Sequence, residues 1–214
     1  DVHGINALVP LGQQGGGDPS ETEGEGHGTA VAGIIGAVGD NGQGIAGVSW
    51  RASIMPLKFR GSAATGTVSD AIECLDYALA KGARVVNASY GLEEYSQAEF
   101  EALQRLRDAG VVVVASAGND GVDTSVTPVY PGSHLIENVV AVGSSSRSDI
   151  VPLSSNYGVG TVDLVAPGVA IRTLGMTAET PLTTVSGTSF AAAHVSGALA
   201  ILRAQYPSDT ATES

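Results

Sequence analysis

One serine in this 214-residue sequence stands where a hydroxyl could do covalent chemistry. Ser189 follows Gly187-Thr188 and precedes an apolar run, 191–202, that predicts a buried helix. A helix N-terminus presents backbone N–H groups without helical acceptors and the positive end of the helix dipole. A serine in that setting becomes a nucleophile when a base lies within reach. The fold should therefore bring a base to Ser189.

The best candidate for that base is a histidine far upstream. His27 lies in Gly26-His27-Gly28-Thr29, between a Gly- and acid-rich loop, 13–26, and a helix of small residues predicted over 27–38. An imidazole titrates near pH 6.5, which suits a general base at neutral pH. The alternative is a solvated histidine at the start of a helix.

A side-chain amide completes the set of reactive groups. Asn119 follows the β-branched run 111–114, which predicts a strand buried on both faces. An amide N–H at the carboxyl end of such a strand can stabilise an oxyanion. The alternative is a turn residue ahead of Asp120-Gly121.

The elements that must carry these residues alternate along the chain. Strands are predicted over 53–59, 84–87, 111–114 and 139–142, and helices over 68–81 (with Gly82 as its C-cap) and 97–109. This alternation predicts an α/β domain with a mostly parallel central sheet, in which reactive groups gather at the carboxyl ends of the strands.

Three motifs in this order carry a resemblance that covers nearly the whole chain. Gly26-His27-Gly28-Thr29, Ala117-Gly118-Asn119 and Gly187-Thr188-Ser189 resemble the subtilisin-like serine protease (subtilase) family, its thermitase-like members above all. The resemblance implies a three-layer subtilisin-like fold with flanking helices and a single peptidase domain over 1–214. It implies a serine endopeptidase working through an acyl-enzyme on Ser189, with His27 as general base. Asn119 and the Ser189 N–H would form the oxyanion hole.

The resemblance also implies where an extended peptide would bind. The strand-like walls would be Ala64, Thr65 and Gly66 on one side and Ser89, Tyr90 and Gly91 on the other. The specificity pocket would be lined by Ala115, Ser116, Ala117, Gly118 and Val129. Val129 stands where relatives often carry Gly or Asn, so we expect a shallow apolar pocket that takes medium-sized side chains. The alternative for Val129 is plain core packing.

The family's catalytic aspartate motif, two apolar residues followed by Asp-Thr/Ser-Gly, is not found in the 214 residues. Asp1-Val2 resembles the stretch that follows this motif, so we expect a domain that is incomplete at its N-terminus and lacks the central Asp-bearing strand. Such a piece would expose two strand edges and cleave slowly. Asp1 itself as the acid is the alternative, while Asp18, Asp40 and Asp163 are expected to be structural.

Two other function classes are alternatives to the endopeptidase. An inactive peptide-binding pseudoprotease is supported only by the absent aspartate motif. An esterase of the α/β-hydrolase type is excluded, because it needs Gly-x-Ser-x-Gly with its histidine after the serine.

A loop over 38–45 resembles the strong calcium site of the family. By that resemblance Asn41 gives its side-chain oxygen, Val38, Gln43 and Ile45 give backbone carbonyls, and Asp1 gives a carboxylate. Such hard oxygen ligands suit Ca²⁺. A metal-free Gly/Asn-rich turn is the alternative.

Composition limits the remaining possibilities. The net charge of −12, from 10 basic and 22 acidic residues, argues against a nucleic-acid partner. Cys74 is the one cysteine, so no intrachain disulfide can form, and its helical setting predicts a small core residue. No apolar run reaches membrane-spanning length. Family habit predicts a secreted, extracellular monomer with a possible pro-segment, acting on protein or peptide substrates. His194 is expected to be structural, and His3 and His134 are given no role.

Overall fold

The computed structural model describes residues 4–9, 18–21, 26–61, 66–177 and 179–208. These residues form helices and strands that alternate along much of the chain. The helices are α1 His27–Gly36, α2 Val68–Ala80, α3 Gln97–Asp108 and α4 Thr188–Gln205. The strands are β1 Ile5–Asn6, β2 Leu57–Lys58, β3 Val85–Ala88, β4 Val112–Ser116, β5 Val139–Ser145, β6 Leu164–Pro167, β7 Ile171–Leu174 and β8 Leu182–Val185.

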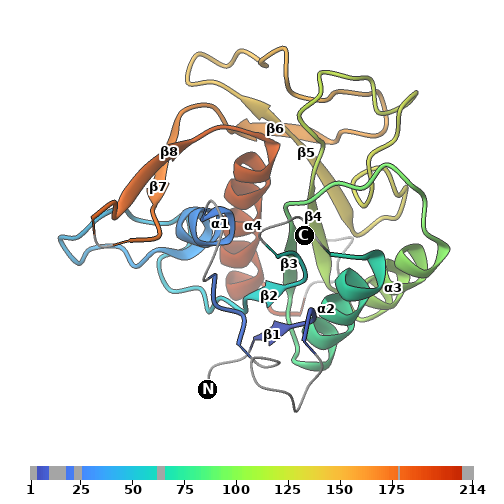
Figure 1. Ribbon diagram of the computed structural model, residues 1–214, viewed down its shortest axis with the longest axis horizontal. Coiled ribbons are helices and arrows are strands. Elements are labelled where there is room, and N and C mark those ends of the chain that lie inside the picture. Colours follow the sequence, from blue (N-terminus) through green and yellow to red (C-terminus); the bar gives the residue numbers. More distant parts are fainter. Residues whose placement is uncertain (1–3, 10–17, 22–25, 62–65, 178, 209–214) are drawn as a thin grey trace.

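The centre of the molecule is a four-stranded parallel sheet in the order β3-β4-β5-β6. Helix α4 covers one face of this sheet, and α2 with α3 covers the other (Figure 1). Along β4, Val113 packs with the α2–α3 core while Val114 packs with α4, because successive strand residues point to opposite faces. Both valines are fully buried. The expected α/β arrangement of a parallel sheet between helices is confirmed.

A second, smaller sheet contains only β1 and β2. Ile5 pairs with Leu57 and Asn6 pairs with Lys58, in parallel register. Among the described strands, β2 hydrogen-bonds to β1 alone and β3 to β4 alone, so the small sheet and the central sheet are separate.

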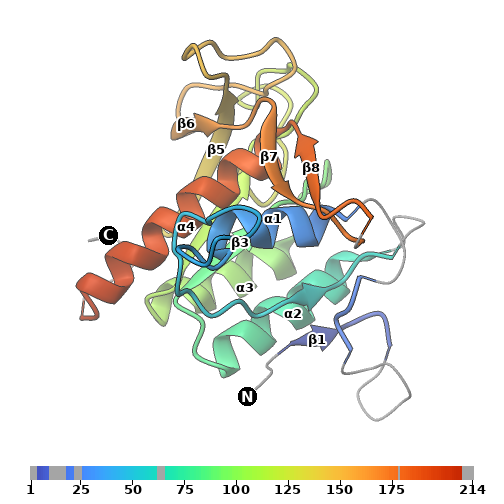
Figure 2. The ribbon, with the colours of Figure 1, turned by 90° about the vertical axis from the view of Figure 1, so that its left-hand side faces the viewer.

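Most predicted elements end within one or two residues of their predicted bounds, but one predicted strand is much shorter than expected and one hairpin was not expected at all. The strand predicted over 53–59 is only the two-residue β2, because its one partner strand in the described residues, β1, is itself two residues long. The antiparallel hairpin of β7 and β8 was not predicted. It projects at the edge of the molecule near α1 (Figure 2).

The helix ends follow local capping chemistry. Thr67 and Asp70 form a reciprocal capping box that starts α2, and Ser96 caps α3 by accepting the backbone N–H of Glu99. Gly82 and Gly110, which follow the ends of α2 and α3, both have a φ of +75°, a conformation that favours glycine. These ends fix where the chain turns back toward the sheet.

Helix α1 packs against α4 at the level of the reactive serine. Ala30, Val31 and Ile34 of α1 share a buried cluster with Phe190 and Ala193 of α4. The small side chains on both helices permit this close contact. No helix in the described ranges is long and apolar enough to cross a membrane.

Candidate active site

The first turn of α4 is the place where the segments that carry the predicted reactive residues meet. Ser189 is the second residue of the helix, so its backbone N–H is one of those without an acceptor inside the helix. Its neighbours on either side, Thr188 and Phe190, contact the segments that carry Asn119 and His27. The structure thus brings three segments that are distant in sequence to one helix end.

Asn119 is held in a defined orientation beside this helix end. The backbone N–H of Thr188 donates to Asn119 Oδ1 at 2.9 Å, and the N–H of Gly118 donates to Thr188 Oγ1 at 3.1 Å. Because a backbone N–H can only donate, its partner atom on Asn119 must be the oxygen. The amide nitrogen of Asn119 therefore points away from Thr188, and its side chain is exposed.

Ser189 is tied to the segment that follows β3. Ser89 Oγ donates to the backbone oxygen of Ser189 at 2.8 Å, and Ser189 Oγ donates to the backbone oxygen of Ser89 at 3.5 Å. The second contact lies at the limit of a hydrogen bond, so it constrains the hydroxyl weakly. The nucleophile candidate is half-buried and keeps some freedom to turn toward another acceptor.

His27 begins α1 with an exposed side chain. Its ring lies against Phe190, with the two ring centroids 5.4 Å apart and the planes inclined by 50°. Gly26, directly before it, has a φ of +71°, and an added Cβ would come within 2.5 Å of Met176. Gly26 therefore positions His27, and a larger residue could neither adopt its backbone conformation easily nor fit in the space beside Met176.

A carboxylate that the sequence did not single out caps α1. Glu21 accepts the backbone N–H of Gly28 at 3.2 Å, and the N–H and hydroxyl of Thr29 at 2.9 and 2.8 Å. A negative side chain at this end of a helix also opposes the positive pole of its dipole. Glu21 thereby fixes the first turn of the helix that His27 begins.

Of the two predicted substrate walls, the one that contains Ser89 contacts this helix end through its hydrogen bonds with Ser189. Ala64 and Thr65 fall outside the described residues. Gly66 approaches the backbone so closely that an added Cβ would lie 2.0 Å from the Phe59 oxygen. An added Cβ on Gly91 would lie 2.8 Å from Val129 Cγ1, so Gly91 and Val129 face each other.

The other predicted pocket residues are less accessible than expected. Ala115, Ser116 and Ala117 are buried, so their side chains belong to the core and only backbone atoms and Gly118 remain to form a wall. The Ser116 hydroxyl donates to the backbone oxygen of Tyr90 at 3.2 Å. This contact links the segment after β3 to the end of β4.

The loop predicted to bind calcium curves around a cavity of about 280 Å³ that residues 38–46 line. No donor in the described part of the chain hydrogen-bonds to the backbone carbonyls of Val38, Gln43 or Ile45. Asn41 Oδ1 accepts the N–H of Gln43 at 3.0 Å and retains a second lone pair. These oxygens fit a hard cation. Asp1 lies outside the described residues, and no cluster of three or more His, Cys, Asp or Glu side chains occurs among the described ones.

Other residues weighed in the sequence have structural surroundings. Asp163 Oδ2 accepts the N–H of Ala141, and a His194 ring nitrogen contacts the backbone oxygen of Phe190 inside α4. Cys74 is buried, as expected of a core residue, and burial, followed by Glu73 and Asp70, raises the pKa of its thiol to about 12. His134 was given no role in the sequence, yet it is buried with its Nε2 atom 3.1 Å from Oε2 of the buried Glu99.

Comparison with known proteins decides the family. A family model described as the subtilase family matches residues 9–214. The chain belongs to the subtilase family. It is 35% identical over 210 residues to Subtilisin Savinase of Lederbergia lenta, which covers 97% of this chain and 72% of that protein. It is equally identical to the Alkaline protease of Alkalihalobacillus alcalophilus, again over 97% of this chain but 51% of the relative.

Solved structures agree with this assignment. A cold adapted subtilisin-like serine proteinase superposes with a TM-score of 0.80 at 28% identity, over 99% of this chain and 71% of that one. The subtilisin-like fold expected from the sequence is thereby confirmed. The chain spans about half the length of the Alkaline protease it matches. The thermitase-like subgroup stays a prediction.

Proposed function

We propose that this subtilase chain is a serine endopeptidase whose reaction centre is the first turn of α4. The observation that carries the proposal is the convergence there of Ser189, the Asn119 amide and the His27 ring, through contacts with Thr188 and Phe190. A nucleophile, an oxyanion donor and a base are the groups that acyl transfer needs.

The steps follow from the positions of these groups. Ser189 Oγ attacks the scissile carbonyl carbon while His27 takes its proton, and the carbonyl oxygen becomes an oxyanion. The Ser189 N–H and the Asn119 amide nitrogen, which is turned away from Thr188, donate to that oxyanion. His27 then protonates the leaving amine as the C–N bond breaks. Water repeats the sequence on the ester and releases Ser189.

The acid that would orient His27 is assigned to none of the described residues. The strand-borne aspartate motif is not found in the sequence, and Asp1 is the alternative acid. Without an acid, the imidazole loses its correct tautomer more often and its cation is less stabilised. We therefore expect slow turnover from this chain.

The substrate binds as an extended peptide alongside residues 89–91, adding a strand by main-chain hydrogen bonds. Its side chain before the cut bond enters the pocket between Gly91, Gly118 and Val129. The apposition of Val129 to both glycines supports a shallow apolar pocket for medium-sized side chains.

A structural Ca²⁺ in the loop 38–46 completes the proposal. The backbone carbonyls of Val38, Gln43 and Ile45 accept no hydrogen bond from the described residues. Together with the Asn41 side-chain oxygen they would supply four of the six to eight oxygens that Ca²⁺ takes. Asp1 would add a carboxylate. The ion would hold the loop that connects α1 to β2 and has no part in the reaction. By analogy with the subtilase family, the protein would act outside the cell as a monomer, after loss of a pro-segment.

Labelling with a fluorophosphonate tests the proposed reaction directly, because the reagent modifies only an activated serine. We expect stoichiometric modification of Ser189, lost in Ser189→Ala and strongly slowed in His27→Ala. A chain that binds a peptide aldehyde yet resists the reagent would instead be the inactive peptide-binding form. Mutation of His194 to Gln is the matched control, since this histidine lies in α4 away from the proposed chemistry.

A further inference from the structure

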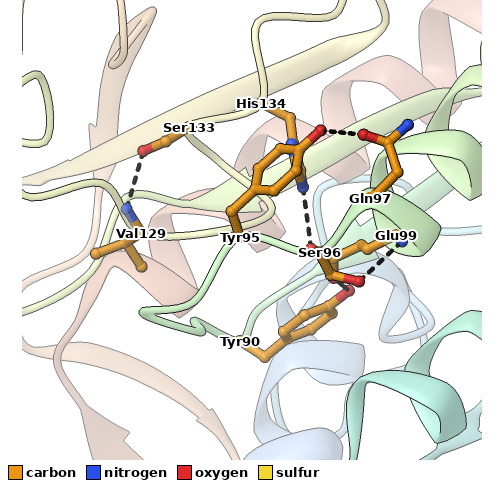
Figure 3. Close-up of polar contacts among 8 residues, drawn as sticks. All are labelled: Tyr90, Tyr95, Ser96, Gln97, Glu99, Val129, Ser133 and His134. Carbon is orange, nitrogen blue, oxygen red and sulfur yellow. Dashed lines mark hydrogen bonds and ion pairs between the residues drawn. The ribbon is translucent and has the colours of Figure 1, made fainter.

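Glu99, the third residue of α3, is fully buried, although ionised side chains are seldom found in that state. Its carboxylate accepts the Tyr90 hydroxyl at 3.0 Å on one oxygen and contacts His134 Nε2 at 3.1 Å with the other. Figure 3 shows these three side chains, here called the buried triplet, converging from three different segments.

The members of the buried triplet come from both sides of the proposed specificity pocket. Tyr90 belongs to segment 89–92, whose Ser89 contacts the nucleophile candidate Ser189. His134 directly follows segment 129–133, which carries Val129. The triplet therefore lies behind the two opposed walls and connects them through Glu99.

Further contacts confine His134 on its other sides. Its ring centroid lies 4.6 Å from that of Tyr130, 5.5 Å from that of Tyr95 and 5.6 Å from that of Phe100. Within segment 129–133, the N–H of Val129 donates to Ser133 Oγ at 3.0 Å (Figure 3). The two segments also exchange hydrogen bonds, since Leu92 and Tyr130 each donate a backbone N–H to the other at 2.8 Å.

Burying the polar groups of Glu99 and His134 costs free energy of desolvation, so a gain in folding stability does not by itself explain why they are there. A buried ion pair is weak evidence for stability, because apolar residues of similar size often replace it without loss. What a directional hydrogen bond does provide is a fixed distance between its partners, which an apolar contact leaves free to slide. A fixed distance between segments 89–92 and 129–133 is the quantity that sets the width of the pocket between Gly91 and Val129.

We propose that Glu99, with His134 and Tyr90, is a positioning element that holds the two walls of the specificity pocket at a fixed separation. This inference rests on the proposed function for its meaning and on geometry for its location. Glu99 and His134 touch no substrate and take no part in proton transfer, while Tyr90 joins them through its hydroxyl and leaves its backbone to the substrate wall. It selects among side chains by preventing the pocket from widening.

The test replaces the pair by apolar residues so that the fold is retained. In the full chain, Glu99→Leu combined with His134→Phe removes both polar partners together, whereas Glu99→Gln keeps an acceptor for the Tyr90 hydroxyl. Asp76→Asn is the matched control, because it breaks an exposed ion pair between α2 and Arg105 of α3. Hydrogen exchange of the Leu92 and Tyr130 amides reports the link between the walls without any need for activity.

We expect these two amides to exchange about tenfold faster in the double variant, while β4 keeps its protection. Because the pocket should widen, kcat/KM for a peptide anilide with Leu before the cut bond should rise about tenfold relative to the anilide with Ala there, the scale of one pocket contact. Glu99→Gln should lie between the double variant and wild type, and Asp76→Asn should match wild type.

Two results would overturn the proposal. One is a folded double variant whose Leu92 and Tyr130 amides exchange as in wild type. The other is faster exchange with an unchanged kcat/KM ratio, which would make the triplet a structural contact only. A wild-type chain that cleaves neither anilide contradicts the proposed function instead, and the exchange rates then decide the link between the walls by themselves.

Discussion

The side-chain oxygen of Asn119 accepts the backbone N–H of Thr188 at 2.9 Å, which ties the end of β4 to the first turn of α4. One hydrogen bond thereby joins the proposed oxyanion donor to the residue before the proposed nucleophile. It also decides which end of the amide is available, since the oxygen is already used.

This contact separates two substitutions of Asn119 that are usually treated alike. Asn119→Asp keeps an oxygen for the Thr188 N–H but removes the N–H donors, whereas Asn119→Leu removes both. We expect kcat to fall by about 10²–10³ in each, the loss measured for such a donor in subtilisin itself, with KM little changed. Only Asn119→Leu should also lower the melting temperature. Full kcat in a folded Asn119→Asp would show that the amide nitrogen does not stabilise the oxyanion.

Glu21 should act on His27 through the helix that both adjoin. Glu21→Ala removes the acceptor of the Gly28 and Thr29 donors, and loss of such a cap costs about 0.5–2 kcal/mol of stability. We expect a lower free energy of unfolding in urea and a lower kcat, with KM unchanged, because His27 begins the same helix turn. Glu137→Ala is the control, because Glu137 is exposed and forms no hydrogen bond or ion pair with another described residue. Equal stability of the two variants would contradict the capping role.

Val129 should limit which side chain precedes the cut bond. Val129→Ala removes the methyl group that faces Gly91, so the pocket deepens. We expect kcat/KM for a Phe anilide to rise about tenfold relative to an Ala anilide, within the range that methylene-sized changes produce. Val126→Ala is the matched control, because Val126 is 78% exposed. An unchanged ratio would assign Val129 to core packing.

Calcium should be visible in the fluorescence of Trp50, the one tryptophan of the chain. Its ring packs so closely on Gly39 that an added Cβ there would lie 2.2 Å from the indole, so the ring senses the loop 38–46. We expect a saturable emission change and a higher melting temperature on adding Ca²⁺, both reversed by chelator and weakened in Asn41→Ala. If neither quantity responds to Ca²⁺ or chelator, the loop is a metal-free turn.

Alkaline pH should destabilise the fold through Cys74. Its pKa is about 12 in the native state against 9.0 for a free thiol, so above pH 9 the unfolded chain binds fewer protons at this group. The stability from this group is complete below pH 9 and is lost as pH rises toward 12. Urea unfolding at several pH values should show a smaller alkaline decline in Cys74→Ala. The native thiol should also resist thiol reagents at pH 8, and rapid labelling there would contradict its burial.

The burial of Tyr90 also lowers the stability of the fold at alkaline pH, in a higher pH range than Cys74. Burial, followed by the charge of Glu99 and the hydrogen bond to it, raises the pKa of Tyr90 well above 10. The stability that the protonated Tyr90 contributes is therefore complete well below pH 10 and declines as pH rises above 10. Measurements between pH 9 and 10 isolate the effect of Cys74.

The sequence predicted those parts of the fold that repeated apolar patterns determine. The continuous apolar run from Val111 to Val114 predicts a strand buried on both faces, and the structure confirms a fully buried strand there that runs from Val112 to Ser116. The hairpin of β7 and β8 escaped prediction because residues such as Thr183 and Thr184 give it neither an apolar run nor a clear alternation. The length of β2 depended on a partner strand, which no local pattern reveals.

Motifs located the reactive residues, but not the groups that hold them. Ser189, His27 and Asn119 were singled out by type and neighbours, and the structure brings their segments together, while their roles stay predictions. Glu99 was missed because a glutamate in the first turn of a helix normally faces water, and its partner His134 lies 35 residues away. Glu21 was missed because a capping contact between residues seven positions apart has no fixed sequence spacing.

The separation of the β1–β2 pair from the central sheet has a consequence for the order in which this protein comes apart. Two residue pairs hold that small sheet together, whereas β4 is hydrogen-bonded on both sides and buried throughout. Under mild denaturant the N-terminal strand should open first, as a unit of its own, and β4 should open last with the whole domain. A protease added in small amounts should therefore make its first cut near β1.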